Sequence, residues 1–158
     1  MNPTKAPSVR AAQPADADAL ARLRYDFRAA LKPVDEAQSE FIVRCSAWMR
    51  ERLAPGGIWM AWVLEVDSAV SGALWMQLME KIPNPVVERE CHGYVTNFYV
   101  VPAHRGTGGG SLLLRAAVEA CERLEVDKMF LWPTARSRPL YARHGFGTQD
   151  DVLVRQTG

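Results

Sequence analysis

The sequence of 158 residues lacks a long apolar run and an excess of charge of either sign, and it contains only three cysteines. No uninterrupted apolar stretch approaches the roughly 20 residues that a membrane-spanning helix needs, so we expect no membrane partner. The 19 basic and 18 acidic residues nearly cancel, to a formal net charge of +1. A dedicated nucleic-acid binder normally shows a strong basic excess, so we expect no nucleic-acid partner either.

The three cysteines do not form a pattern that is typical of metal sites. Cys45, Cys91 and Cys121 are odd in number, far apart and without metal-ligand spacing. We expect three reduced thiols in apolar positions, no metal site and a cytoplasmic location. The N-terminal residues 1–7 have no apolar core and do not resemble a secretory signal. We expect them to form a flexible tail, and residues 8–158 to form a single domain.

The spacing of apolar residues predicts a chain that mixes strands and helices. The first helix should carry its apolar face on Leu20, Leu23, Phe27 and Leu31. The helix after the glycines should bury a stripe of Leu113, Ala117, Ala120, Cys121 and Leu124. The expected elements are a strand over 8–12, a helix that ends before Lys32-Pro33, a helix over 35–53, strands over 58–66, 69–82 and 91–101, a helix after the glycines at 108–110, a strand over 128–132, a helix over 137–144 and a final strand over 152–155. This pattern alone indicates an α/β or α+β fold with a mixed sheet.

The most informative stretch runs from Asn97 to Leu114 and reads as a strand, a glycine-rich turn and a helix. The first turn of a helix has unpaired N–H donors, and its dipole adds roughly half a positive charge there. Glycine inside a helix costs about 1 kcal/mol relative to alanine, so three in a row are costly unless something must approach the backbone closely. The stretch therefore predicts a phosphate-binding loop, with a flexible turn that binds nothing as the alternative.

Two common phosphate-binding loops match this stretch poorly. The loop of nucleotide hydrolases requires a lysine after its last glycine, and Ser111 follows Gly110 here. A dinucleotide-binding loop requires a third glycine where Ser111 stands, and it normally follows a first strand. Gly106 and Gly108 fit that pattern, but the loop lies late in the chain, which leaves dinucleotide binding as a distant alternative.

A third family fits residue by residue. The segment Arg105-Gly-Thr-Gly-Gly-Gly110 resembles the Arg/Gln-x-x-Gly-x-Gly/Ala acyl-CoA signature of the GCN5-related N-acetyltransferases (the GNAT superfamily), and Tyr99-Val-Val-Pro102 matches the usual upstream flank. A tyrosine followed by Gly-Phe, here Tyr141 and Gly145-Phe146, resembles the second hallmark of that family. The resemblance implies a mixed, mostly antiparallel central sheet flanked by helices, in the order β-α-α-β-β-β-α-β-α-β. It also implies that the strands ending near Val101 and Trp132 splay apart into a slot for the cofactor.

The resemblance implies an enzyme that moves an acetyl group from acetyl-CoA to a primary amine of a small molecule or a protein, by direct attack on the thioester. Backbone N–H groups of the glycine loop would hold the pyrophosphate, and the strand at Tyr99 and Val100 would pair with the pantetheine arm. A main-chain N–H near Val100 would bond the thioester oxygen. The residues expected to bind acetyl-CoA are Phe98, Tyr99, Val100, Arg105, Gly106, Thr107, Gly108, Gly109, Gly110, Ser111 and Tyr141.

Two side chains are the expected catalytic groups. By resemblance, the Tyr141 phenol would bond the coenzyme sulfur and donate a proton to the departing thiolate, and Asn97 could orient a water molecule. The alternative for Tyr141 is simple packing on Phe146. No general base stands out; the candidates, each more typical of a solvated surface residue, are Glu40, Glu88, Glu90 and His92. Two positions depart from the family pattern, because Gly109 replaces a branched aliphatic residue and Thr134 replaces an asparagine.

The acceptor is the least determined feature. Trp48, Trp59, Trp62 and Trp75 lie in segments that frame the acceptor pocket in the resembling family. Trp59 and Trp62 should face opposite sides of a strand, so at most one can enter the cleft. Packing in the core is the more common role for each tryptophan; one that lined the pocket would favour an amine with an apolar or aromatic portion. A coenzyme-A-binding module without turnover stays an alternative to the enzyme, and the tryptophan-rich hairpin is a candidate surface for a homodimer.

Overall fold

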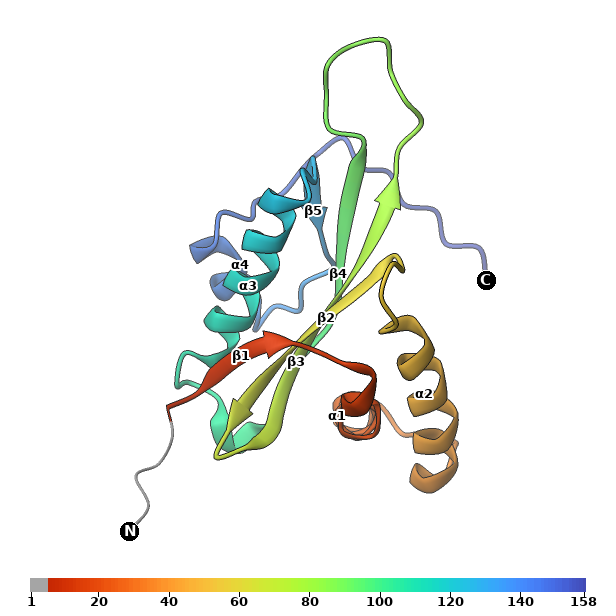
Figure 1. Ribbon diagram of the computed structural model, residues 1–158, viewed down its shortest axis with the longest axis vertical. Helices are drawn as coiled ribbons and strands as arrows, with labels where there is room; N and C mark the ends of the chain where they lie inside the picture. Colours follow the sequence, from red (N-terminus) through yellow and green to blue (C-terminus); the bar gives the residue numbers. More distant parts are fainter. Residues whose placement is uncertain (1–5) are drawn as a thin grey trace.

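In the part of the chain that the structure describes, five strands form a single sheet in the order β1-β2-β3-β4-β5, and helices cover both of its faces (Figure 1). The computed structural model describes residues 6–158, so residues 1–5 of the expected tail lie outside the described residues. Strands β1 to β4 pair in antiparallel fashion, and β5 joins the edge of β4 in parallel. The strands are β1 (Ser8–Ala11), β2 (Trp59–Val66), β3 (Ala69–Glu80), β4 (Cys91–Val100) and β5 (Lys128–Phe130). The expected mixed, mostly antiparallel sheet is confirmed.

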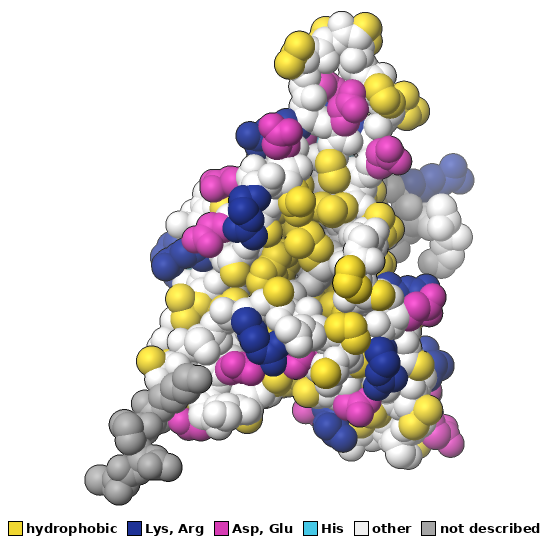
Figure 2. All heavy atoms as spheres, viewed as in Figure 1, with side chains coloured by type: hydrophobic (Ala, Val, Ile, Leu, Met, Phe, Trp, Pro, Cys, Tyr) yellow, Lys and Arg dark blue, Asp and Glu magenta, His cyan; other side chains and the backbone are white. Residues whose placement is uncertain are grey.

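The helices divide into two pairs, one on each face of the sheet. Helices α1 (Ala17–Ala29) and α2 (Gln38–Arg52) cover one face, and α3 (Gly109–Arg123) and α4 (Arg138–Arg143) cover the other (Figure 1). Figure 2 shows apolar side chains gathered over the strands between α3 and α2, with charged side chains around them. No helix within residues 6–158 is long and apolar enough to cross a membrane.

The alternation of side chains along the strands assigns them to two cores. On β2, Trp62 and Leu64 pack toward α3, whereas Trp59, Ala61 and Val63 pack toward α1 and α2. Period-two alternation sends successive side chains to opposite faces, and because both faces are covered the whole strand is apolar. The prediction that Trp59 and Trp62 lie on opposite faces is therefore confirmed.

The expected final strand over 152–155 is wrong. Within residues 6–158, the segment beyond Asp151 pairs with no strand, and Val152, Leu153 and Val154 are 61%, 96% and 64% exposed. An alternating apolar segment becomes a strand only where a neighbouring strand offers hydrogen bonds, and local sequence does not reveal whether one does. The order of elements therefore ends at α4.

Two side chains expected on buried helix faces also prove exposed. Leu31 is 50% exposed and lies beyond the end of α1, and Leu124 is 45% exposed at the C-cap of α3. In both cases the apolar periodicity continues past the last helical turn, so the residue no longer faces the sheet. The second helix begins at Gln38, later than the expected residue 35.

Gly109 is a glycine because its helix packs closely on the sheet. A methyl group added at Gly109 would collide with the Leu64 side chain, which is completely buried, whereas one added at Gly110 would make ordinary contacts of 3.5 Å with Leu140 and Phe98. Gly109→Ala should therefore lower the free energy of unfolding by about 1–3 kcal/mol, the usual effect of overpacking a core. Chemical denaturation measures this difference.

Gly110→Ala is the matched control for that substitution. It lies one residue further along the same helix turn, and alanine has the better helix propensity by about 1 kcal/mol, so stability should stay the same or rise. The Gly109→Ala penalty should also shrink in a Leu64→Ala background, because the colliding atoms are then absent. Equal destabilisation by Gly109→Ala and Gly110→Ala would contradict the packing explanation.

Candidate active site

A cleft opens where β4 and β5 part. The parallel pairing of these strands covers only the pairs from His92–Lys128 to Tyr94–Phe130, and β4 then continues to Val100 without β5 beside it. A cavity of about 870 Å³ lies there, between the free edge of β4, the segment after β5, and α4. The unpaired edge of β4 leaves backbone groups that an extended ligand can bond, as an added peptide strand does. The expected splaying of these two strands is therefore observed.

A bulge in β4 turns the strand at the floor of this cleft. Two pairs with β3, Trp75–Thr96 and Ala73–Tyr99, are separated by two residues on β3 and by three on β4, so β4 carries one extra residue. Asn97 lies inside the bulge with φ of 50°, a left-handed conformation that asparagine tolerates better than most residues. A one-residue insertion reverses the faces of the residues that follow it.

This reversal is visible in the packing. Before the bulge, Val95 packs on the α3 side; after it, Tyr99 packs on the α1 side, although the two are four residues apart. The Tyr99 ring stacks on Phe27 of α1 at a centroid distance of 5.3 Å. Phe98 and Val100 consequently face α3 and α4. The bulge therefore leaves the backbone around Asn97 and Phe98 outside the regular ladder with β3.

The glycine loop presents a run of free backbone donors. The first helical hydrogen bond of α3 runs from Leu112 N–H to the Gly108 carbonyl, at 3.1 Å. Within the described chain, no backbone N–H from Gly106 to Ser111 donates to another protein group. The loop lines the same cavity through Gly106, Gly108, Gly110 and Ser111. Such a run, at a helix N-terminus with its positive dipole end, can bind an anion.

Different physical constraints explain why glycine occupies each of four positions in this loop. Gly106 and Gly108 have φ of 74° and 88°, which side-chain-bearing residues rarely adopt. Gly109 is required by its contact with Leu64. Only Gly110 has neither an unusual conformation nor a steric need, and it faces the cavity. Gly110 is therefore the position at which close approach of a ligand best explains a glycine.

The cavity is strongly cationic. Among the described residues that line it, no aspartate or glutamate occurs, and five arginines do: Arg24, Arg28, Arg105, Arg136 and Arg143. The whole chain has a net charge of only +1, so this concentration of positive charge is local. A cavity lined by one sign of charge attracts a ligand of the opposite sign, here a polyanion.

Arg105 also braces the strand that leads into the loop. Its Nε donates a hydrogen bond of 2.8 Å to the Val100 carbonyl, and its guanidinium lies 5.3 Å from the centre of the Tyr99 ring. These contacts tie the chain after β4 back onto the strand. Arg105, which was expected to bind the cofactor, therefore has a structural role as well.

Tyr141 faces the cavity between two aromatic rings. Its ring makes edge contacts with Phe98 and Phe146, at centroid distances of 6.0 and 5.6 Å, so the expected packing on Phe146 is present. Its hydroxyl makes no hydrogen bond within residues 6–158 and is not among the fully buried polar atoms. Burial raises the pKa of Tyr141 to about 12, so the phenol stays protonated at neutral pH. It can therefore donate a hydrogen bond to a ligand.

Most of the residues predicted from sequence meet in this one cavity. Asn97, Phe98, Tyr99, Val100, Arg105 and Tyr141 line it together with four residues of the glycine loop. Thr107 and Gly109 do not line it: the Thr107 hydroxyl donates to the His104 carbonyl, at 2.9 Å, and Gly109 packs inward. Thr134 lines the cavity and exchanges hydrogen bonds with Ser137 at the start of α4.

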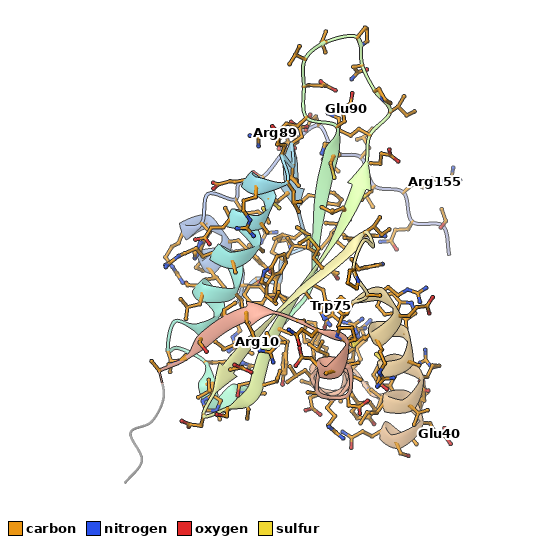
Figure 3. The ribbon with its side chains drawn as sticks, in the orientation of Figure 1. Arg10, Glu40, Trp75, Arg89, Glu90 and Arg155 are labelled. Atoms are coloured by element: carbon orange, nitrogen blue, oxygen red, sulfur yellow. The ribbon has the colours of Figure 1, made fainter. Side chains whose placement is uncertain are left out.

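None of the candidate general bases lies at the cavity. Glu40 lies near one end of α2 and Glu90 near the loop before β4, both well away from Trp75 at the centre of the molecule (Figure 3). His92 lies beside Asp127, with 3.7 Å between Nδ1 and the carboxylate. Sequence reasoning missed Arg24 and Arg28, which come from α1, and Arg136 and Arg143, which flank or lie in α4. Charge alone does not distinguish these arginines from solvated surface residues.

A second cavity, of about 580 Å³, adjoins the first. Arg24, Thr96 and Asn97 line both cavities, so the bulge in β4 lies where the two meet. Three of the four tryptophans considered above line the second cavity: Trp48, Trp59 and Trp75. Trp62 packs in the opposite core. The Trp75 Nε1 is buried and finds no acceptor among the described residues, a cost of about 1–3 kcal/mol.

The chain matches one protein-family model and resembles several solved structures. The model of the acetyltransferase (GNAT) family matches residues 21–146. A GCN5-related N-acetyltransferase from Ralstonia eutropha JMP134 superposes with a TM-score of 0.74 at 25% identity, over 96% of this chain and 99% of that one. A predicted acetyltransferase from Clostridium acetobutylicum, solved with acetyl-CoA, gives a TM-score of 0.76 at 21% identity over 95% and 96%.

A third similar structure has a known acceptor. An aminoglycoside acetyltransferase from an uncultured soil metagenomic sample, solved with sisomicin, gives a TM-score of 0.70 at 14% identity over 96% of this chain and 95% of that one. At this identity the likeness shows the fold alone. The family match covers the glycine loop and Tyr141 and leaves the acceptor unspecified.

The bracing contacts of Arg105 generate a stability prediction. Arg105→Lys keeps the charge but cannot combine the hydrogen bond to Val100 with stacking on Tyr99, because lysine lacks the planar guanidinium. We expect a loss of about 1–2 kcal/mol in the free energy of unfolding, measured by urea denaturation without ligand. Arg136→Lys is the control, since Arg136 lines the same cavity and forms no hydrogen bond or ion pair within residues 6–158. Equal effects of the two substitutions would show that Arg105 does not brace the strand.

Proposed function

The chain belongs to the acetyltransferase (GNAT) family, and from that membership we propose that it is an acetyl-CoA-dependent N-acetyltransferase that acts on a primary amine of a small molecule or peptide. The observation that carries the proposal is the run of free backbone N–H groups from Gly106 to Ser111, beside a cavity lined by five arginines. Coenzyme A carries a diphosphate and a further phosphate, and this site offers donors and positive charge for them.

The shape of the cavity fits the rest of the donor. The free edge of β4 from Val95 to Val100 can pair with the amide groups of the pantetheine arm. That edge leads from the glycine loop to the bulge at Asn97, where the second cavity begins. An acyl group carried on the arm would therefore arrive where an amine from the second cavity can meet it. Direct transfer needs this meeting of donor and acceptor in one site.

The residues around the bulge would supply the chemistry. Acetyl-CoA supplies an acetyl group on a thioester; the carbon–sulfur bond breaks as the carbon–nitrogen bond forms. A backbone N–H near Asn97, Phe98 or Val100 would stabilise negative charge on the thioester oxygen. Tyr141 would give its proton to the leaving sulfur and recover one from solvent, and the neutral amine would lose one proton to solvent. Asn97 would orient a water molecule for that last step.

The cytoplasmic location and a homodimer stay predictions. The location follows from the cysteine pattern, and the homodimer from the tryptophan-rich hairpin. Trp62 and Trp75 of this hairpin are only 6% and 2% exposed, so the hairpin has less apolar surface for a partner than its sequence indicated.

The anion site can be tested by reversing its charge. Gly110→Asp places a carboxylate in the first turn of α3, where it favours the helix dipole by about 0.3–1 kcal/mol but repels a phosphate. Wild-type protein should gain about 2.7 kcal/mol of stability at an acetyl-CoA concentration 100 times the dissociation constant, and Gly110→Asp should gain almost none. Thermal denaturation with acetyl-CoA, free coenzyme A and NAD measures both.

Ser39→Asp is the matched control, because it adds the same charge to the first turn of α2, on an exposed residue outside both cavities. It should keep the full stabilisation by acetyl-CoA. Stabilisation of the wild type by NAD but not by acetyl-CoA would overturn the proposal. Binding of acetyl-CoA without turnover of any amine would instead favour the coenzyme-A-binding module.

The role of Tyr141 gives a kinetic prediction. Tyr141→Phe preserves the packing on Phe98 and Phe146 but removes the proton donor, so kcat should fall by roughly 10²- to 10⁴-fold with little change in acetyl-CoA affinity. Since burial raises the pKa of Tyr141 to about 12, wild-type kcat should show no loss from phenol ionisation until the pH nears that value. Steady-state release of free thiol measures both. Turnover near the wild-type rate in Tyr141→Phe would show that the tyrosine only packs.

A further inference from the structure

The second cavity has the composition of a site for a particular kind of amine. Phe41 of α2 lines it, and the rest of its aromatic wall consists of three tryptophans from different elements: Trp48 from α2, Trp59 from β2 and Trp75 from β3. Their ring centroids lie 5.3 to 6.2 Å apart, and two of the three pairs meet edge to face. Such a wall buries a large apolar area and favours a flat, apolar ligand group. An aromatic or extended apolar substituent is the portion of an acceptor that fits it.

The charged residues of this cavity are not equivalent. Arg44 pairs with Glu36 at 2.6 Å, and Arg52 pairs with Glu51 at 2.7 Å. Arg24 forms no ion pair within the described chain; its Nη1 approaches the Asn97 side-chain oxygen, at 3.4 Å, and its guanidinium lies 5.9 Å from the centre of the Phe27 ring. Desolvation by burial, and secondarily the nearby charge of Arg28, lowers the pKa of the Arg24 guanidinium, which nonetheless stays charged. Arg24 is therefore a partly buried cation without a counter-ion, a state that a bound anion would relieve.

The position of Arg24 limits where that anion can be on the acceptor. Arg24 lies beside Asn97, at the junction of the two cavities. The reacting amine must reach the same junction to meet the acyl group. The anionic group and the amine of the acceptor must then lie within a few bonds of one another, while the apolar group extends along the tryptophan wall. An α-amino acid with an aromatic side chain has this arrangement.

We propose that the second cavity binds an α-amino acid with an aromatic side chain, with its carboxylate on Arg24 and its ring against the wall that Trp48 and Trp59 form over the buried Trp75. The proposal rests on the acetyl-transfer function proposed above and names the acceptor class of that site. The nearby guanidinium also disfavours an ammonium ion, which helps to present the amine in its neutral, nucleophilic form.

The same residues disfavour a polycationic acceptor. A tryptophan wall can bind cations through its ring faces, but Arg52 already lies 4.8 Å from the centre of the Trp48 ring, and Arg44 lies 5.4 Å from that of Phe41. Only one acidic residue, Glu51, is among the described lining residues, and Arg52 pairs with it. Aminoglycosides carry several positive charges, so we expect this chain to differ from its aminoglycoside-acetylating structural relative in the acceptor it takes.

Four amines test the proposal with acetyl-CoA as donor. L-phenylalanine carries both recognition groups, L-phenylalaninamide lacks only the negative charge, L-alanine lacks the ring, and kanamycin is a polycation. We expect kcat/KM for L-phenylalanine to exceed that for L-alanine at least tenfold, with no turnover of kanamycin. In Arg24→Gln the kcat/KM ratio of L-phenylalanine to L-phenylalaninamide should fall at least tenfold, whereas Arg22→Gln, on an exposed residue of the same helix outside both cavities, should leave it unchanged.

Calorimetric titration of L-phenylalanine in the presence of coenzyme A gives a readout that does not need turnover. Binding that is lost in Arg24→Gln and kept in Arg22→Gln supports the proposal. The acceptor class is overturned if acetyl-CoA binds and kanamycin or L-alanine is the better substrate, or if the phenylalanine-to-amide ratio is the same in Arg24→Gln and wild type. A preference for the amide that Arg24→Gln does not alter would point to peptide N-termini instead. Failure of acetyl-CoA to stabilise the wild type would overturn the transferase function itself, a result distinct from all of these.

Discussion

The extra residue in β4 at Asn97 is the constraint on which the site depends. Without it, Tyr99 would share the face of Val95 and pack toward α3; with it, Tyr99 stacks on α1, and Phe98 turns toward Tyr141. A bulge interrupts the ladder of hydrogen bonds, and a left-handed asparagine adds some local strain. Packing on both faces of the sheet holds that conformation in place. The result is irregular backbone at the point where the two cavities join.

A second constraint is the early end of the pairing between β4 and β5. Because β5 is only Lys128–Phe130, the remaining length of β4 has a free edge inside the molecule and not at its outer rim. An unpaired edge is normally protected against association with other chains. Here α4 and the segment before it lie across from the edge, so that the edge forms one wall of a cationic cavity. The sheet thus provides binding groups from its backbone, which explains why few side chains of the site look catalytic.

The main elements and the glycine loop could be predicted from sequence because their signals are local. The apolar run of β2, the Pro55-Gly56-Gly57 segment after the second helix and the glycines after Arg105 are each signals carried by a few neighbouring residues. The predicted strand over 152–155 failed for the opposite reason, since a strand depends on a distant partner. The bulge also escaped prediction: nothing in Thr96-Asn97-Phe98 distinguishes an inserted residue from ordinary alternation, and only the register with β3 reveals it.

The acceptor side of the site was the hardest part to predict, and the reason is geometric. Its wall combines residues from α1, α2, β2, β3 and β4, which are close only after the chain has folded. The tryptophans could be noticed because they are rare and clustered, and the period of a strand already limited the cleft to one of Trp59 and Trp62. Arg24 had no comparable signal, because it is one of many arginines in the chain and its lack of a counter-ion is a property of its surroundings. The kind of acceptor that this site can bind therefore depends less on sequence motifs than on which charged side chains the fold leaves without a partner. Arg24 is such a side chain within the described residues, and it lies where the donor and acceptor cavities meet.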